Sequence, residues 1–345
     1  MAHMSEHHPL FAARRRTGLL AAALLASVLG ASSALADAAS TSSLPDLKAV
    51  GWQSLGYSRA NIWASVSSRI ALHELPASAM TDGGLPQGLG SSQGASQGAS
   101  QGASQGLSPA GGQVLLLQAD SQAASNRERL SVWFDPLADT LLQRCRVAYG
   151  RSDSRAQCYR YGDATVWRER RERSGNGGPD EPEWVQGGAK TAVVPDWTVS
   201  SRVRLSRPVA IPADAGLVSP MLLLPLASAA PLEARGDSQT VHVHTDQDFF
   251  RVTLRVQGRE TVDVEYRQTA MDGTTRKIVG PVRVLVVEVE PHAVGTAREP
   301  FTLLGMSGPL QLLLDPATRV PLAVRGEAPW VGATELRLDS VRLAR

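Results

Sequence analysis

The feature that most constrains the fold of this 345-residue chain is a long series of short β-type segments separated by turn-forming residues. Apolar and polar residues alternate in most of these segments, as in a strand with one buried face. Asp135-Pro136 and Asp315-Pro316 favour type I turns between such segments. The expected strands are residues 62–75, 114–120, 129–134, 140–149, 155–168, 198–205, 239–244, 249–257, 260–266, 282–290, 310–314, 322–325 and 334–343.

One apolar segment, residues 214–228, departs from the strand pattern because it contains Pro220 and Pro225. Asp214 or Ser219 can cap the start of a helix, Pro220 suits its first turn, and Pro225 would end or kink it. A succession of strands with one such helix predicts a mainly β protein. We expect a single strongly curved antiparallel sheet, a half-barrel or β-clam, with one short apolar helix across its concave side.

The expected sheet domain covers residues 59–345, and a segment of low complexity interrupts it. Residues 76–113 are rich in Gly, Ser, Gln and Ala and repeat the sequence Ser-Gln-Gly-Ala. Such a segment buries too little apolar surface to offset the entropy lost on ordering, so a flexible loop is predicted. Residues 37–58 are small and polar, and we expect them to be only loosely ordered.

The first 36 residues have the pattern of an export signal. Arg14-Arg15-Arg16 precedes an apolar run over residues 19–29, and Ala34-Leu35-Ala36 supplies small residues for cleavage after Ala36. The run is shorter than the roughly 20 residues that span a bilayer, and no Cys lies nearby to carry a lipid. We therefore expect a soluble exported protein without a stable membrane anchor, located in the periplasm of a Gram-negative cell.

Net charge argues against nucleic acid as a partner. The whole chain has 35 Lys and Arg against 33 Asp and Glu, but residues 1–36 hold three of the arginines and one of the glutamates. The remainder therefore has 32 basic and 32 acidic residues, and is formally neutral. A neutral exported protein lacks the excess positive charge that draws proteins to phosphate backbones.

The two cysteines, Cys145 and Cys158, flank a segment with turn-forming residues at its centre. A hairpin turning between Arg151 and Ser152 places the cysteines opposite each other, within reach of a disulfide. An oxidising compartment favours that bond over two reduced core thiols. The same register pairs Tyr149 with Ser154 and Val147 with Ala156.

Residues 236–248 contain the strongest candidate for a metal site, formed by His242, His244 and Asp248. The spacing resembles the first metal motif of cupins, but Asp stands where Glu is usual and no second motif follows. A hairpin turning at Asp246-Gln247 pairs His242 with Arg251, whose charge would repel a cation. We therefore expect no metal or other cofactor, with the histidines on the solvent face. The register also pairs Gln239 with Leu254, Val241 with Val252, Val243 with Phe250 and His244 with Phe249.

Local signatures of catalysis are missing from the sequence. It has no Gly-x-Ser-x-Gly elbow, no His-Glu-x-x-His motif and no phosphate-binding loop. Residues 167–173 carry four arginines and two glutamates, which fit a charged edge strand or a patch for phosphate or lipid headgroups. These observations favour a protein that is not an enzyme.

Residues 208–343 contain short motifs that resemble a family of bacterial periplasmic proteins, domain of unknown function 3108. The motifs are the apolar segment 217–226, Ala230-Pro231-Leu232-Glu233, a Gly-x-Glu-x-Val step at residues 258–262, and a strand–turn–strand close over residues 313–325. The resemblance implies a clam-like half-barrel with a helix over its concave side, a shape similar to that of envelope lipoprotein carriers. It implies no catalytic residue.

Our leading hypothesis is a non-enzymatic periplasmic protein that binds a lipid-like or apolar ligand in envelope maintenance. The alternatives are a protein-interaction or sensor module that uses the outer sheet face or an edge strand, and a metal-dependent or hydrolytic enzyme. The residues expected to face the concavity and its ligand are Leu217, Val218, Met221, Leu222, Leu224, Val252, Leu254, Val284 and Val286.

Overall fold

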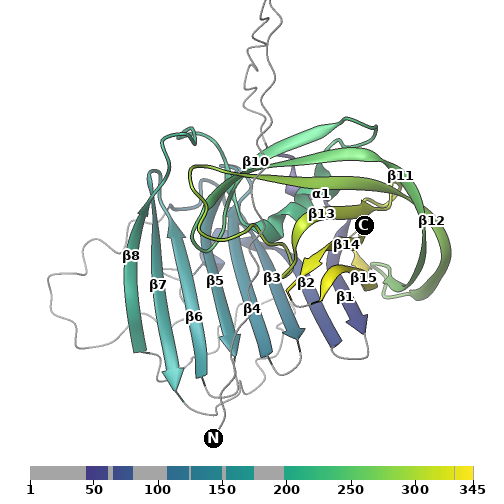
Figure 1. The fold of residues 1–345 in the computed structure, drawn as a ribbon, viewed down its shortest axis with the longest axis horizontal. Coiled ribbons are helices and arrows are strands. Elements are labelled where there is room, and N and C mark those ends of the chain that lie inside the picture. The colour runs from purple at the N-terminus through teal and green to yellow at the C-terminus, as the bar shows by residue number, and fades with distance from the viewer. Residues whose placement is uncertain are drawn as a thin grey trace, which may run out of the picture. The chain divides into compact units, whose positions relative to one another are not determined.

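In the described part of the chain, fifteen strands form one curved sheet, which confirms the expected fold class (Figure 1). The computed structural model describes residues 44–60, 65–80, 107–123, 126–149, 153–174, 198–329 and 331–344. The strands are β1 (Trp52–Ala60), β2 (Ser65–Pro76), β3 (Gln113–Ala123), β4 (Asn126–Asp135), β5 (Thr140–Tyr149), β6 (Asp153–Tyr161), β7 (Thr165–Ser174), β8 (Thr198–Ser206), β9 (Leu217–Val218), β10 (Ser238–His244), β11 (Phe249–Thr269), β12 (Thr275–Ala293), β13 (Ser307–Leu314), β14 (Pro321–Ala328) and β15 (Gly332–Leu343).

The strand order joins two halves of the sheet between β1 and β15. One half runs from β8 to β1, and the other runs from β15 back to β9. All neighbouring strands pair antiparallel except β9 and β10. In addition, the end of β11 pairs parallel with β15, where Arg267 lies opposite Ser340 and Thr269 opposite Arg342. Strands β11 to β15 therefore close into a ring of five strands, which we call the ring.

The one α-helix among the described residues, α1 (Leu223–Ala229), follows a 3-10 turn, η3 (Pro220–Leu222), and lies beneath β10 to β12 (Figure 1). Pro220 begins the turn, as expected. Pro225 does not end the helix, contrary to our expectation, because it lies in the first turn of α1, where no N–H is needed for the α-helical hydrogen bonds. Two further 3-10 turns are η1 (Leu47–Ala49) and η2 (Ala77–Ala79).

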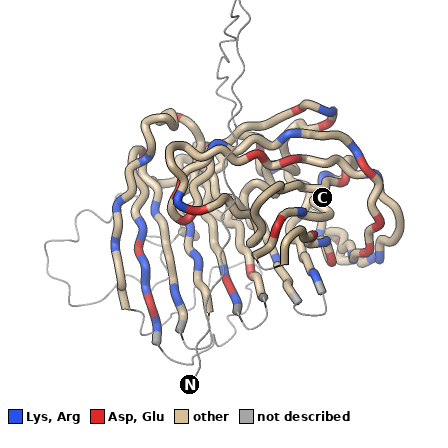
Figure 2. The backbone as a smooth tube through the Cα atoms, in the orientation of Figure 1, with Lys and Arg blue, Asp and Glu red and all other residues tan. Residues whose placement is uncertain are grey.

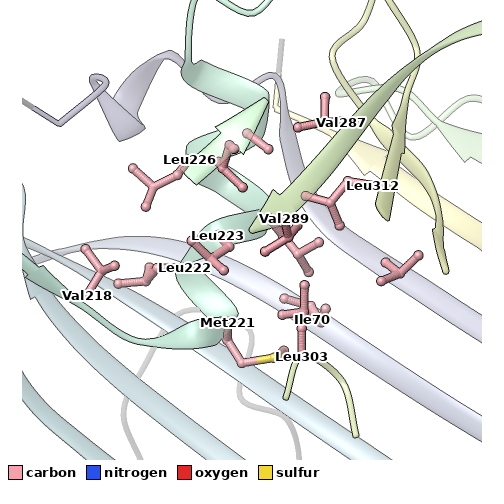
Figure 3. Close-up of a cluster of buried hydrophobic side chains, with 14 of the residues drawn as sticks. Ile70, Val218, Met221, Leu222, Leu223, Leu226, Val287, Val289, Leu303 and Leu312 are labelled. Carbon is pink, nitrogen blue, oxygen red and sulfur yellow. The ribbon is translucent and has the colours of Figure 1, made fainter. Parts of the chain in front are cut away.

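The helix is the centre of the apolar core. Leu223, Leu224 and Leu226 are completely buried, and residues from both halves of the sheet pack around them (Figure 3). The end of α1 is capped by Arg319, whose guanidinium donates hydrogen bonds to the carbonyl oxygens of Ala227, Ser228, Ala230 and Leu232. These bonds satisfy carbonyls that a helix end leaves without partners.

Both hairpin registers predicted from the sequence are confirmed. Cys145 lies opposite Cys158 and is bonded to it, and Tyr149 pairs with Ser154. In the β10–β11 hairpin, His242 lies opposite Arg251 and Val243 opposite Phe250. Both turns are local, so the chain's own pattern of apolar and polar residues is sufficient to set the pairing.

Some strand boundaries differ from the expectation. Residues 44–58 are not loosely ordered: they form η1 and most of β1, and Trp52, Leu55 and Tyr57 are buried. Residues 249–266 lie in one long strand, because the chain pairs with β12 on both sides of a bulge between Val256 and Gly258. The charged strand β7 pairs on both sides, so β8 is the edge instead.

Other expectations lie outside the described residues. These are the export signal at residues 1–36 and most of the Gly/Ser/Gln/Ala-rich loop, residues 81–106. The described ends of that loop contact each other, since Ala77 N donates to Gly112 O. None of the described helices is long and apolar enough to cross a bilayer.

Candidate functional site

All nine residues expected to face a ligand are buried in the apolar core. Leu217 and Val218 form β9, the last strand in the sheet order, whereas Met221, Leu222 and Leu224 lie in η3 and α1. All five pack in the apolar core. Met221 lines one of the two cavities described below, and the other eight residues line neither. Eight of the nine side chains therefore contribute to the apolar core without lining either cavity.

The larger cavity, of about 1060 Å³, lies at the ring, and we call it the ring cavity. Five consecutive residues of β11 line it, from Val262 to Tyr266, and they include the charged Asp263 and Glu265. Residues of β12 to β15 and of β1 complete the lining. The apolar residues contributed by β13, β14 and β15 are Leu313, Leu322, Ala323 and Leu338.

A chain of ion pairs crosses one wall of the ring cavity. Arg325 Nη1 lies 2.6 Å from Glu260 Oε1, and Arg325 Nε lies 2.5 Å from Glu335 Oε2. The other oxygen of Glu335 accepts from Arg337 Nε at 2.6 Å. Burial alone would raise the pKa of Glu335, but the two guanidinium groups lower it overall. The four charges of this chain compensate one another, but the lining as a whole has three arginines and five carboxylates, a formal charge of −2.

Such a cavity can hold a molecule with an apolar chain and a polar group. Its volume lies slightly above the usual range of roughly 300–1000 Å³ for small-molecule sites, and its lining combines apolar side chains with eight charged ones. Charged residues occur along β6 to β8 and on the β11–β12 hairpin (Figure 2). Two charged residues of β11, Asp263 and Glu265, line the ring cavity, which is therefore a candidate site for an amphiphilic ligand.

The second cavity, of about 690 Å³, lies against strands β2 to β6, and we call it the strand-face hollow. It is bounded on its other sides by η3, by the β10–β11 turn and by residues 299–305. Its lining combines apolar side chains, such as Leu130 and Met221, with the arginines Arg127, Arg144, Arg146 and Arg155.

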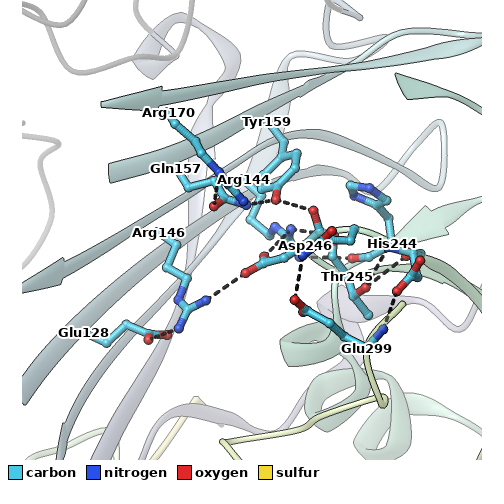
Figure 4. A network of polar contacts seen from close by, with 12 residues as sticks. Glu128, Arg144, Arg146, Gln157, Tyr159, Arg170, His244, Thr245, Asp246 and Glu299 are labelled. Carbon is cyan, nitrogen blue, oxygen red and sulfur yellow. Dashed lines mark hydrogen bonds and ion pairs between the residues drawn. The ribbon is translucent and has the colours of Figure 1, made fainter. Parts of the chain in front are cut away.

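Arg144 joins the two halves of the sheet beside this hollow (Figure 4). Its side chain is only 4% exposed, and its guanidinium donates to His244 O at 3.0 Å and to Thr245 O at 2.7 Å. The same group donates to Asp246 Oδ1 at 2.8 Å. A buried guanidinium with these partners fixes the β10–β11 turn over β5.

Two more side chains hold the same turn. Arg146 Nη1 donates to Asp246 Oδ2 at 2.8 Å, while Nη2 donates to Glu128 at 2.6 Å. Tyr159 donates its hydroxyl proton to Asp246 O at 2.6 Å, and its ring lies beneath the guanidinium of Arg144. We call Arg144, Arg146, Tyr159 and the turn residues 244–246 the clasp.

His244 corrects one prediction from the sequence. We expected it on the solvent face, but it is fully buried against Tyr159, Tyr161 and Phe249. The sheet curls far enough for the end of β10 to lie over β6, so both faces of β10 are covered there. Burial, with Arg144 nearby, holds the pKa of His244 well below its usual 6.5.

The candidate metal ligands do not form a metal site in the described part of the chain, where no group of three or more His, Cys, Asp or Glu side chains is placed to hold an ion. His244 Nδ1 lies 3.0 Å from the hydroxyl oxygen of Tyr161. Asp248 Oδ2 accepts hydrogen bonds from the backbone N–H groups of Arg298 and Glu299. His242 is partly buried, and burial lowers its pKa.

Sequence reasoning missed both the ring cavity and the clasp. One signal for the clasp was present, because the predicted cysteine register already places Arg144 directly opposite Tyr159. An arginine opposite an aromatic residue can form a cation–π contact, as Arg144 and Tyr159 do. The ring had no comparable local signal, since it depends on pairing between β11 and β15.

Comparison with known proteins identifies no relative of this chain. No protein-family model matches the chain, and neither a curated protein nor a solved structure shows significant similarity to it.

Proposed function

We propose that this protein is an exported, non-enzymatic binding protein of the bacterial envelope that holds a lipid-like molecule in the ring cavity. The observation that carries this proposal is the cavity of about 1060 Å³, with Val262, Val264 and Leu313 on its wall. An apolar chain placed there would leave water at a gain of about 0.8 kcal/mol for each buried CH₂ group.

Export to the periplasm is part of the proposal. The pattern of residues 1–36 supports it, because a basic segment, an apolar run and a small-residue cleavage site follow in order. The Cys145–Cys158 disulfide fits an oxidising compartment. The resemblance of residues 208–343 to domain of unknown function 3108 points to the same compartment.

Native mass spectrometry of protein purified from the envelope of its own cell tests the function. We expect the wild type to carry an added mass in the range of a lipid. The variant Val264→Trp, which places a larger side chain on the cavity wall, should lose it. Val209→Trp is the matched control, because Val209 is fully exposed and outside the cavity, and it should retain the added mass. A clean protein mass for the wild type would argue against the proposal.

The open edge of the sheet favours a second candidate function. Among the described strands, β8 ends the strand order and pairs only with β7, and its residues are alternately exposed and half-buried. Such an edge can accept a strand from a partner protein. Cross-linking in cells would support this alternative if one stable partner were captured through β8 while the protein mass stayed free of ligand.

A further inference from the structure

The two ends of the sheet differ in how they are protected from further strand pairing. At one end, β9 has only two residues, Leu217 and Val218, which are both buried, and Pro220 follows closely. At the other end, β8 has nine residues, contains no proline and pairs only with β7 among the described strands (Figure 1). Short strands and prolines protect sheet edges, and β8 lacks both protections. Its side away from β7 therefore presents a long row of backbone N–H and C=O groups.

The side chains of β8 divide between the two faces of the sheet. Half-buried residues alternate with exposed ones along all nine positions. Two of the half-buried residues, Val203 and Leu205, lie opposite Arg168 and Val166 of β7, and Leu205 also packs against the apolar core. A strand added beside β8 would extend this apolar row if its own apolar residues faced the same side.

The edge carries an excess of positive charge. Strands β7 and β8 together contain six arginines and two glutamates (Figure 2). On the exposed face of β8, Arg202 is 55% exposed and shares the carboxylate of Glu169 with Arg171. Arg204 is also exposed and lies over the ring of Trp167 at 5.1 Å, and it has no ion pair with a carboxylate of the described residues. This face of the edge therefore suits a strand that brings further carboxylates.

These observations specify a partner for the open edge, the second candidate function above. We propose that β8 accepts an extended segment of another protein in which apolar residues alternate with Asp or Glu. The backbone of this segment continues the hydrogen-bond ladder of the sheet, and its apolar residues lie beside Val203 and Leu205. Its carboxylates lie beside Arg202 and Arg204. The inference rests on that second candidate function and not on the ring, because no residue of β8 lines either cavity.

A second copy of this chain fits the edge poorly. An antiparallel pair of two β8 strands would place Arg202 and Arg204 of both copies on one face of the joined sheet. Like charges on neighbouring strands destabilise their pairing. The two arginines therefore oppose self-association and favour an acidic partner.

Fluorescence anisotropy with labelled peptides and the full chain tests the proposal. The probe is a peptide as long as β8 in which valine alternates with glutamate. One control peptide has lysine in place of glutamate, and another has the composition of the probe with its valines and glutamates in two blocks. We expect the probe to bind at least tenfold more tightly than either control. Amide hydrogen exchange at residues 198–206 should also slow at least tenfold when the probe binds.

A charge reversal then assigns the preference to the edge. Arg204→Glu changes an exposed residue without breaking an ion pair, so the variant should fold normally. Its affinity for the glutamate peptide should fall about fivefold, and its affinity for the lysine peptide should rise. The matched control is Arg283→Glu, which should leave both affinities unchanged. Arg283 is also exposed, but it lies on β12, which has a neighbour on each side.

The possible failures are distinguishable. If no peptide bound, or if exchange at residues 198–206 did not slow, the open edge and the second candidate function would both be overturned. Equal binding of the glutamate and lysine peptides would overturn only the acidic partner. A dimer of the wild type that protects residues 198–206 without peptide would overturn the proposal in favour of a second copy. None of these outcomes bears on the ring cavity.

Discussion

The ring cavity and the strand-face hollow are bounded by different kinds of contact. At the ring, backbone hydrogen bonds join β11 to β15 and complete a continuous ladder around five strands. At the strand-face hollow, side chains of the clasp hold the β10–β11 turn against β5 and β6. One closure therefore depends on backbone pairing, and the other depends on a few charged and aromatic groups.

This difference affects how each cavity responds to its surroundings. Backbone pairing is insensitive to moderate changes of pH, so the ring should keep its shape wherever the protein is folded. The clasp contains a buried arginine, two ion-pair contacts with Asp246 and a buried histidine. Electrostatic contacts of this kind weaken when one of the partners changes its charge. We therefore expect the ring to keep its shape when the pH changes, whereas the contacts of the clasp should weaken.

Of the changes considered, loss of Arg144 should lower the free energy of unfolding the most. Arg144→Ala removes the bonds to His244, Thr245 and Asp246, and leaves buried acceptors without partners. We expect the free energy of unfolding to fall by about 4 kcal/mol, the usual cost of breaking a buried pair. Urea unfolding measures it. The control Arg146→Ala should cost only about 1 kcal/mol, because that side chain is 43% exposed. Equal losses in both variants would contradict the special role of Arg144.

Removal of the disulfide should have the second largest effect. Cys145 and Cys158 are 13 residues apart and connect the strands that carry the clasp. The double variant Cys145→Ser/Cys158→Ser should lower stability by about 3 kcal/mol through the entropy of the unfolded chain. Urea unfolding with and without reductant checks this. If reductant left the unfolding midpoint of the wild type unchanged, the bond would not be formed in solution.

The ion pairs of the ring cavity should contribute less. Glu335→Gln replaces a carboxylate that is 22% exposed and shared by Arg325 and Arg337, so we expect a loss of about 1.5 kcal/mol. Thermal unfolding at neutral pH measures the change. The exposed pair of Lys48 and Glu74, which does not line the cavity, provides the control, and Glu74→Gln should cause no measurable loss. A larger effect for Glu74→Gln would contradict the assignment of the network to the cavity wall.

The smallest effect is the pH dependence introduced by His244. Its pKa is lowered in the folded state, so below pH 6.5 the unfolded chain takes up a proton that the folded chain does not. Stability should therefore fall by about 1 kcal/mol per pH unit as the pH decreases from 6.5. Urea unfolding between pH 7 and pH 5 should show a weaker dependence of stability on pH in His244→Phe than in the wild type. Equal slopes in the two proteins would argue against a buried neutral His244.

Local features of the fold were predictable from the sequence, and long-range ones were not. Asp135 illustrates the first kind, since its carboxylate accepts from the backbone of Leu137 and Ala138 in the expected turn. The parallel pairing of Arg267 with Ser340 illustrates the second kind, because it joins distant segments and follows from the curvature of the whole sheet. Strand β1 was missed for another reason: its small and polar residues give a weak β pattern, and burial between β2 and β15 stabilises it.

The candidate site followed the same rule. Burial of Leu222 and Leu224 could be expected from an apolar helix over a sheet, and the structure places both in the core. Whether space for a ligand remains beside them depends on how closely side chains of several strands pack, and no short pattern encodes that. The ring cavity and the buried Ser219 hydroxyl therefore could not be predicted from the sequence and are seen only in the folded structure.

The most direct test of the central claim, that the ring cavity takes an apolar chain, is methyl NMR of the valine and leucine side chains during titration with octyl glucoside. The methyl signals of Val262, Val264 and Leu313 should shift with a single saturable curve. The signals of Val66 and Leu130 in the strand-face hollow should stay in place. Shifts confined to the hollow, or no shift at the ring at saturating concentration, would contradict the account.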